Sequence, residues 1–206
     1  MSKKNLIVGQ SGGPTAVINS SLYGVVSEGL RHPEQIQHIY GMVNGIEGFL
    51  AGTVLDFATA LPGSNLEKLK TTPGAYLGSC RYKLPESLED PVYPRLFQKF
   101  REMNIGWFFY IGGNDSMDTV SKLSRYAAQT GSDIRIIGEP KTIDNDLVHT
   151  DHTPGFGSAA RYVASTVREI TTDANVYEKK SVTIVEIMGR NAGWLTAASA
   201  LARTEC

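Results

Sequence analysis

Short apolar runs alternate along this chain with stretches in which apolar residues recur at helical spacing. The apolar runs lie at residues 6–8, 36–40, 107–111, 134–138 and 182–187. Strands that are nearly continuous in apolar residues are typical of parallel sheets, which helices cover on both faces. The alternation therefore predicts an α/β fold with five strands in a parallel sheet.

Helices are predicted after four of the five runs. The apolar positions that define them are Ile18, Leu22, Val25, Val26 and Gly29, then Met117, Val120, Leu123 and Ala127, then Ala160, Val163, Ala164, Val167 and Ile170, and finally residues 194–201. Residues 41–101 are less regular and contain many Gly, Pro and Ser residues. We expect loops and short helices over one edge of the sheet there.

Polar motifs follow several of the predicted strands. Residues 9–13 follow the first run, residues 112–116 the third, residues 140–146 the fourth and residues 188–190 the fifth. In an open α/β sheet, ligands bind beyond the carboxyl ends of the strands. Glycine amides, one cation and spare carboxylates at such ends are what phosphoryl transfer with Mg²⁺ requires.

Neither of the two common nucleotide-binding fingerprints occurs in its proper structural context. The pattern G-x-x-x-x-G-K-[ST] is absent. Residues 155–160 match G-x-G-x-x-A, but a polar loop precedes them where a dinucleotide site needs a strand. We therefore expect these glycines to start the next helix. The glycines of residues 9–13 could likewise only shape a strand-to-helix turn.

Charge and cysteine content exclude several classes of protein. The net charge is −1 and no long run of Lys or Arg occurs, so no nucleic-acid or membrane partner is expected. The first apolar run is too short for a signal-peptide core or a membrane span. Cys80 and Cys206 form neither a disulfide framework nor a ligand set, which predicts a reduced, cytoplasmic protein. His149 and His152 match no strong zinc pattern.

These motifs, together with Gly78-Ser79-Cys80-Arg81, have an order and spacing that resembles the N-terminal part of phosphofructokinases, more specifically the pyrophosphate-dependent kind. The resemblance implies the Rossmann-like α/β lobe of that fold over residues 1–206, with the C-terminal lobe largely missing. It also implies a Mg²⁺-dependent transfer of phosphoryl from pyrophosphate to the 1-hydroxyl of fructose 6-phosphate, giving fructose 1,6-bisphosphate. A cytoplasmic homo-oligomer that serves glycolysis or gluconeogenesis is expected.

The resemblance assigns a phosphate-donor site to Gly12, Gly13, Gly113 and Ser116, with Arg81 bridging donor and acceptor. Asp115 and Lys141 both stand where ATP-using relatives usually carry glycine. A carboxylate at position 115 would occupy the space of a nucleotide's α-phosphate, and two like charges ~4 Å apart cost roughly 4 kcal/mol at an effective dielectric of 20. Lys141 could stabilise charge on the transferring phosphoryl. Both residues therefore favour pyrophosphate as the donor.

Asp144 is the predicted general base, because the reaction needs a carboxylate within reach of the sugar's 1-hydroxyl. The resemblance places the sugar phosphate on Thr142, Ile143, Asp144, Asp146, Met188, Gly189 and Arg190, with Arg190 near the reacting phosphoryl. Mg²⁺ is expected at Asn114 and Asp146. The family usually has aspartate where this chain has Asn114, and asparagine coordinates a metal with less charge.

Several alternatives stay open. The protein could use ATP or both donors, or be a catalytically silent phosphate-binding or regulatory homologue, which Asn114 and the missing lobe favour. Residues 144–146 could simply form a turn, and Arg190 could pair with Glu186. Lys180 could replace an arginine that reaches the sugar phosphate of a neighbouring subunit. A dinucleotide oxidoreductase is the weakest alternative, because no fingerprint follows a strand.

Overall fold

The structure, a computed structural model, describes residues 3–61 and 63–202. The chain divides into two compact units. The first ends at Lys141 and the second begins at Thr142. Cys80 is a free, buried thiol, whereas Cys206 lies outside the described residues. Among the helices in the described ranges, none is long and apolar enough to cross a membrane.

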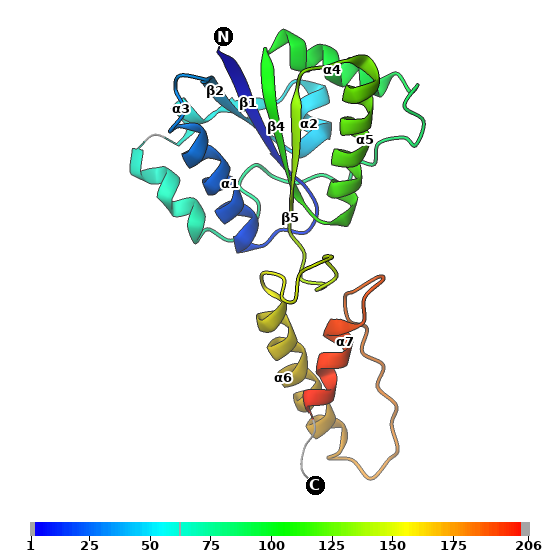
Figure 1. Ribbon diagram of the computed structural model, residues 1–206. Coiled ribbons are helices and arrows are strands. Elements are labelled where there is room, and N and C mark those ends of the chain that lie inside the picture. The colour runs from blue at the N-terminus through cyan, green and yellow to red at the C-terminus, as the bar shows by residue number, and fades with distance from the viewer. Residues whose placement is uncertain (1–2, 62, 203–206) are drawn as a thin grey trace. The chain divides into compact units, whose positions relative to one another are not determined.

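The first unit contains a five-stranded sheet with the strand order β3-β2-β1-β4-β5 (Figure 1). The strands are β1 (Lys4–Gln10), β2 (Ile36–Met42), β3 (Val54–Asp56), β4 (Ile105–Gly112) and β5 (Arg135–Pro140). β1 pairs in parallel with β2 and β4, and β4 pairs in parallel with β5. The α/β parallel sheet predicted from the sequence is therefore confirmed, with one antiparallel addition, β3, at the β2 edge.

The order of the strands creates a switch point between β1 and β4. The chain leaves β1 for β2 on one side and later returns to β4 on the other side. The loops that follow β1 and β4 therefore open next to each other at the carboxyl edge of the sheet. Ligands of open α/β sheets bind at such a point.

Side chains alternate between two cores on the two faces of the sheet, as a strand requires. On β1, Leu6 and Val8 join one cluster and Ile7 joins the other. Helix α1 (Ala16–Gly29), α3 (Phe57–Ala60) and the 3₁₀ helix η1 (Gly63–Lys70) cover the Leu6 face, and α2 (Gly45–Ala51), α4 (Val92–Glu102) and α5 (Asn114–Thr130) cover the Ile7 face (Figure 1).

The irregular segment 41–101 holds more structure than the sequence analysis expected. The short helices α2 and α3 and the 3₁₀ helix η1 were anticipated in kind, whereas β3 and the 11-residue helix α4 were not. α4 buries Tyr93, Leu96, Phe97 and Phe100. These positions follow the i, i+3, i+4, i+7 spacing of an amphipathic helix, so the signal for α4 was present in the sequence.

The second unit contains α6 (Phe156–Ala174), which packs against α7 (Trp194–Ala198) and the 3₁₀ helix η2 (Ser199–Ala202). Gly155, with a φ of 89°, directly precedes α6. The expectation that this glycine starts a helix is therefore confirmed, and both helices predicted for this unit are present. None of the α6 residues is fully buried.

The predicted strand at residues 182–187 is wrong. No strand is assigned to these residues, and the side chains of Val182 and Ile184 are each 91% exposed. A strand exists only through hydrogen bonds to a neighbouring strand, and the described residues of the second unit include no other strand. Residues 188–190 consequently do not lie at the end of a strand.

Candidate active site

The loops that follow β1 and β4 lie in contact. Gly12 has a φ of +82°, a conformation that L side chains rarely adopt. A Cβ atom on Gly12 would lie 3.6 Å from the backbone nitrogen of Gly113. The hydroxyl of Ser116, in the first turn of α5, donates to the Ser11 hydroxyl over 2.9 Å. Two predicted donor-site loops thus meet at the switch point of the sheet.

Gly112 is required by the close approach of these loops. A Cβ atom at this position would lie 2.1 Å from Oγ of Ser116 and 2.6 Å from the carbonyl oxygen of Ser11. Real Cβ atoms do not approach other atoms so closely, and the carbonyl belongs to the backbone, which cannot rotate away. The contact between the β1 loop and the start of α5 therefore depends on glycine here.

We expect Gly112→Ala to lower the thermal midpoint by roughly 2–12 °C, the shift that ~1–3 kcal/mol of overpacking produces. Gly24→Ala is the control, because a Cβ at this α1 position meets no atom within 4 Å. Differential scanning calorimetry on both variants tests the difference. Equal thermal midpoints for the two variants would contradict the close packing at residue 112.

Lys141 joins the β5 end to the β1 loop. Its backbone nitrogen donates to the Gly112 carbonyl over 2.7 Å, and its Nζ donates to the carbonyl of Gly13. The residue is buried. Because a buried ammonium must be hydrogen-bonded or paired, the side chain is held in one place. The structure therefore fixes a positive charge beside the glycines of the β1 loop.

Helix α5 begins at Asn114 and carries Asp115 in its first turn. Unpaired amides and the helix dipole make the start of a long helix favourable for an anion. Nζ of Lys83 lies 3.8 Å from Oδ1 of Asp115, and both side chains are more than half exposed. Such an exposed ion pair contributes little to stability. Sequence reasoning missed Lys83, whose only signal is its position two residues after Arg81.

A buried amide pair positions the segment that carries Arg81. Gln10 donates to Oδ1 of Asn19 over 3.0 Å and accepts a hydrogen bond from the backbone nitrogen of Leu77 over 2.9 Å. Further along, the Ser79 hydroxyl donates to the Gly12 carbonyl over 2.7 Å. Arg81 itself is exposed. Sequence reasoning missed Gln10 and Asn19, although a polar residue at the end of an apolar strand was a signal.

The predicted sugar-binding residues lie in the second unit, where residues 142–153 form an ordered turn. The hydroxyl of Thr142 accepts a hydrogen bond from the backbone nitrogen of Asp144 over 3.0 Å. Asn145, with a φ of 59°, donates to the Asp151 carbonyl over 3.2 Å and accepts from the backbone nitrogen of Thr153 over 2.9 Å. Asn145 therefore shapes the turn, while its neighbours Asp144 and Asp146 supply carboxylates.

The other residues of this unit are placed as follows. Ile143 approaches Gly155, where a Cβ would lie 3.1 Å away. Gly189 has a φ of 135°, and a Cβ there would lie 2.3 Å from the Ala192 carbonyl. Met188 is 70% exposed and Arg190 is also exposed. The structure thus brings Thr142 and Asp144 together, and it sets residues 188–190 in a glycine turn.

The predicted metal ligands belong to different units, Asn114 to the first and Asp146 to the second. Across the described residues, no group of three or more His, Cys, Asp or Glu residues could hold a metal ion. His152 instead packs edge-on against the Phe156 ring at 5.6 Å between centroids. Mg²⁺ usually binds through one or two carboxylates plus substrate phosphates and water. Asn114 and Asp146 each offer a side-chain oxygen of the kind that such binding uses.

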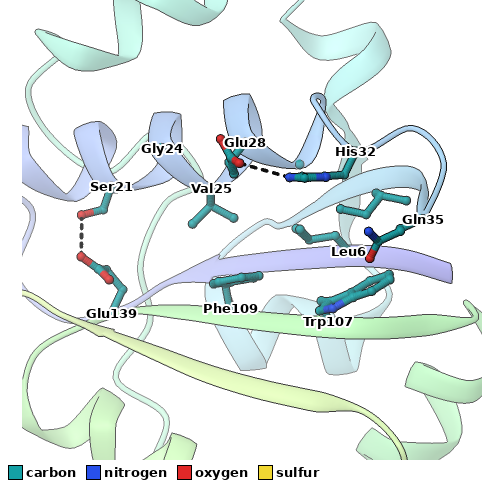
Figure 2. Close-up of a pocket in the computed structure, with 12 residues that line it drawn as sticks. Leu6, Ser21, Gly24, Val25, Glu28, His32, Gln35, Trp107, Phe109 and Glu139 are labelled. Carbon is teal, nitrogen blue, oxygen red and sulfur yellow. Dashed lines mark hydrogen bonds and ion pairs between the residues drawn. The ribbon is translucent and has the colours of Figure 1, made fainter.

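A separate groove of about 480 Å³ lies between α1 and the sheet. Its lining contains none of the predicted site residues (Figure 2). Trp107 and Phe109 of β4 line it together with Leu6 of β1, and Ser21 donates to Glu139 over 3.5 Å at its rim. The groove is therefore distinct from the loops at the carboxyl ends of the strands.

His32, at the rim of this groove, has a raised pKa because it is hydrogen-bonded to Glu28 and then to Glu34. The nitrogen–oxygen distances are 3.1 Å to Glu28 and 3.2 Å to Glu34. We expect Glu28→Gln to lower the His32 pKa more than Glu34→Gln does, since the bond to Glu28 is the larger cause. NMR titration of the imidazole measures both changes. A larger drop in the Glu34 variant would contradict this order.

The chain is similar to known proteins over nearly its whole length. The phosphofructokinase family profile matches residues 5–205. The chain is 42% identical to a pyrophosphate–fructose 6-phosphate 1-phosphotransferase of Methylococcus capsulatus, covering 100% of this chain and 49% of the relative. It is 46% identical to an enzyme of the same name from Rhodospirillum rubrum, covering 98% and 48%. The chain spans about half the length of these curated relatives.

One solved structure resembles this chain in both sequence and fold. The pyrophosphate-dependent phosphofructokinase of Marinobacter aquaeolei superposes with a TM-score of 0.78 at 44% sequence identity. The match covers 98% of this chain and 50% of that one.

Proposed function

The chain belongs to the phosphofructokinase family, as its motifs predicted, and we propose that its protein transfers phosphoryl from pyrophosphate to the 1-hydroxyl of fructose 6-phosphate. One observation carries the proposal. The β1 loop, the start of α5 and Lys141 converge at the carboxyl ends of three neighbouring strands. Backbone amides and a fixed cation together suit a small, highly charged phosphate donor.

On the donor side, Gly12, Gly13, Gly113 and Ser116 line the phosphate site. Lys141 stabilises the charge that develops on the transferring group, and Arg81 bridges donor and acceptor through its planar guanidinium. Asp115 fills the space that a nucleotide's α-phosphate would need. The names of the relatives at 42% and 46% identity support this choice of donor.

On the acceptor side, Asp144 removes the proton of the 1-hydroxyl. The resulting oxygen attacks the terminal phosphorus of pyrophosphate, the bridging P–O bond breaks, and inorganic phosphate leaves with its electron pair. Arg190 stabilises the charge on the transferring group. The sugar phosphate is held by Thr142, Ile143, Asp146, Met188, Gly189 and Arg190.

The proposal includes a divalent metal, with Mg²⁺ as the ion. Asn114 and Asp146 would hold it, with water and the donor's oxygens completing the coordination. Bound Mg²⁺ would neutralise part of the donor's charge. We further propose that residues 1–206 form one N-terminal lobe, that the protein is a homo-oligomer and that it is cytoplasmic. The free thiol of Cys80 supports the cytoplasmic location.

A coupled assay with Mg²⁺ and fructose 6-phosphate tests the function. It should use the longest reading frame that contains this sequence, with pyrophosphate and ATP run side by side. We expect turnover with pyrophosphate alone. Turnover with ATP alone would overturn the donor assignment, and turnover with both would show a mixed-donor enzyme. Calorimetric binding of pyrophosphate without turnover would show a phosphate-binding homologue.

A further inference from the structure

Residues 77–86, hereafter the strap, carry Arg81 and are fastened at several points. Beyond the bonds at Leu77 and Ser79, the Cys80 sulfur lies 3.7 Å from the Tyr110 hydroxyl on β4. The Tyr93 hydroxyl of α4 donates to the Pro85 carbonyl over 2.6 Å. These contacts lead the strap from the β1 loop to the α4 and α5 face of the sheet.

Lys122 of α5 holds the far end of the strap. Its Nζ donates to the Leu84 carbonyl over 3.1 Å and to Oε1 of Glu86 over 2.6 Å, both on the strap. It also pairs with Oδ2 of Asp118, one turn earlier on α5, over 2.7 Å. An ammonium has three donors, and these three acceptors use all of them.

This lysine is unusual in its burial. The side chain of Lys122 is only 4% exposed, whereas that of Glu86 is 89% exposed and that of Asp118 54% exposed. Hydrogen bonds to Asp118 and then to Glu86 raise the pKa of Lys122, so the group stays charged at neutral pH. Removing the ammonium from water carries a cost, which its contacts with the Leu84 carbonyl and the two carboxylates offset. The three contacts hold the ammonium in one geometry between α5 and the strap.

We infer that Lys122 is a positioning residue that holds the strap, and with it Arg81, against the start of α5 at the donor site. Between the anchored Ser79 and Leu84, Arg81 and Lys83 are exposed, and Lys83 reaches Asp115. The strap therefore meets α5 twice, at its first turn and again at Lys122. This inference rests on the proposed function, because the consequence for catalysis runs through Arg81 and the donor.

The two carboxylates around Lys122 allow a matched test. Glu86→Gln and Asp118→Asn each remove one negative charge from the same ammonium, but only Glu86 belongs to the strap. We expect Glu86→Gln to raise the KM for pyrophosphate about threefold, the equivalent of ~0.65 kcal/mol, because solvent screens an ion pair whose carboxylate is 89% exposed. Asp118→Asn should raise it less than about twofold. The KM for fructose 6-phosphate should change in the same order, because Arg81 bridges donor and acceptor in the proposed function.

Lys122→Met and Lys122→Arg complete the series. Lys122→Met should reproduce the Glu86→Gln effect, and Lys122→Arg should restore most of the pyrophosphate KM. If Lys122 only stabilises α5, Glu86→Gln and Asp118→Asn will have equal effects, and that result would overturn the inference. Because Glu86 is exposed, its variant stays informative even if Lys122→Met fails to fold.

Hydrogen exchange of the strap amides gives a readout that does not need activity. Exchange at residues 77–86 should quicken in the Glu86→Gln protein and stay unchanged in the Asp118→Asn protein. If the unmutated protein turns over no pyrophosphate, the proposed function fails, while the exchange difference still decides whether Lys122 holds the strap. Equal exchange in both variants would overturn the positioning role.

Discussion

Asp144→Asn should lower the kcat for fructose 6-phosphate phosphorylation by roughly 10²–10⁴-fold, the usual contribution of a general base. Asparagine has nearly the same shape as aspartate but cannot accept the proton of the 1-hydroxyl. The turn should persist, because the hydroxyl of Thr142 accepts its hydrogen bond from the backbone nitrogen of residue 144. The KM for fructose 6-phosphate should therefore change much less than kcat. Steady-state kinetics with saturating pyrophosphate measures both constants.

Asp151→Asn is the matched control for this prediction. The Asp151 side chain is exposed, and only its backbone carbonyl joins the turn, by accepting from Asn145. The same chemical change at this neighbouring position should leave kcat within about twofold. If Asp144→Asn retains more than a tenth of the kcat of the unmutated protein, another group removes the proton and the assignment of Asp144 is wrong.

The double variant Asp115→Gly with Lys141→Gly should gain use of ATP. Two charges ~4 Å apart repel by roughly 4 kcal/mol at an effective dielectric of 20, or about three decades in affinity. The Asp115 side chain is 58% exposed, so solvent reduces this repulsion. We therefore expect a gain of at least about tenfold in kcat/KM for ATP. Activity with pyrophosphate should fall in parallel, because the cation held against Gly13 is lost.

The single variants separate the two contributions. Asp115→Gly alone should admit the nucleotide, and Lys141→Gly alone should mainly weaken turnover with pyrophosphate. Asp118→Asn on the same helix is the control for a general loss of negative charge from α5. The coupled assay with each donor measures the change in preference. A double variant that keeps the original donor preference would contradict the roles given to Asp115 and Lys141.

Local patterns were sufficient for the elements of the parallel sheet. The apolar runs at 6–8, 36–40 and 107–111 lie within β1, β2 and β4, and the run at 134–138 overlaps β5 from Arg135 onward. β1 and β4 are largely buried, as apolar strands of a covered parallel sheet should be, whereas β5 at the edge of the sheet is mostly exposed. The run at 182–187 is also mainly apolar, but the described residues of its own unit contain no strand that pairs with it. Composition indicates that a segment can form a strand, whereas pairing decides whether it does.

The sequence by itself determined the family, the four parallel strands and which motifs end them, because these depend on residue type and spacing within short windows. Only the tertiary structure decided which motifs meet. The hydroxyls of Ser11 and Ser116 are 105 residues apart and hydrogen-bonded, and Lys141 reaches back 128 residues to Gly13. In the sequence, Lys122 does not differ from other helix lysines, and only the fold shows that its side chain is buried against the strap. Such contacts depend on strand order and on side-chain burial, which no local pattern encodes.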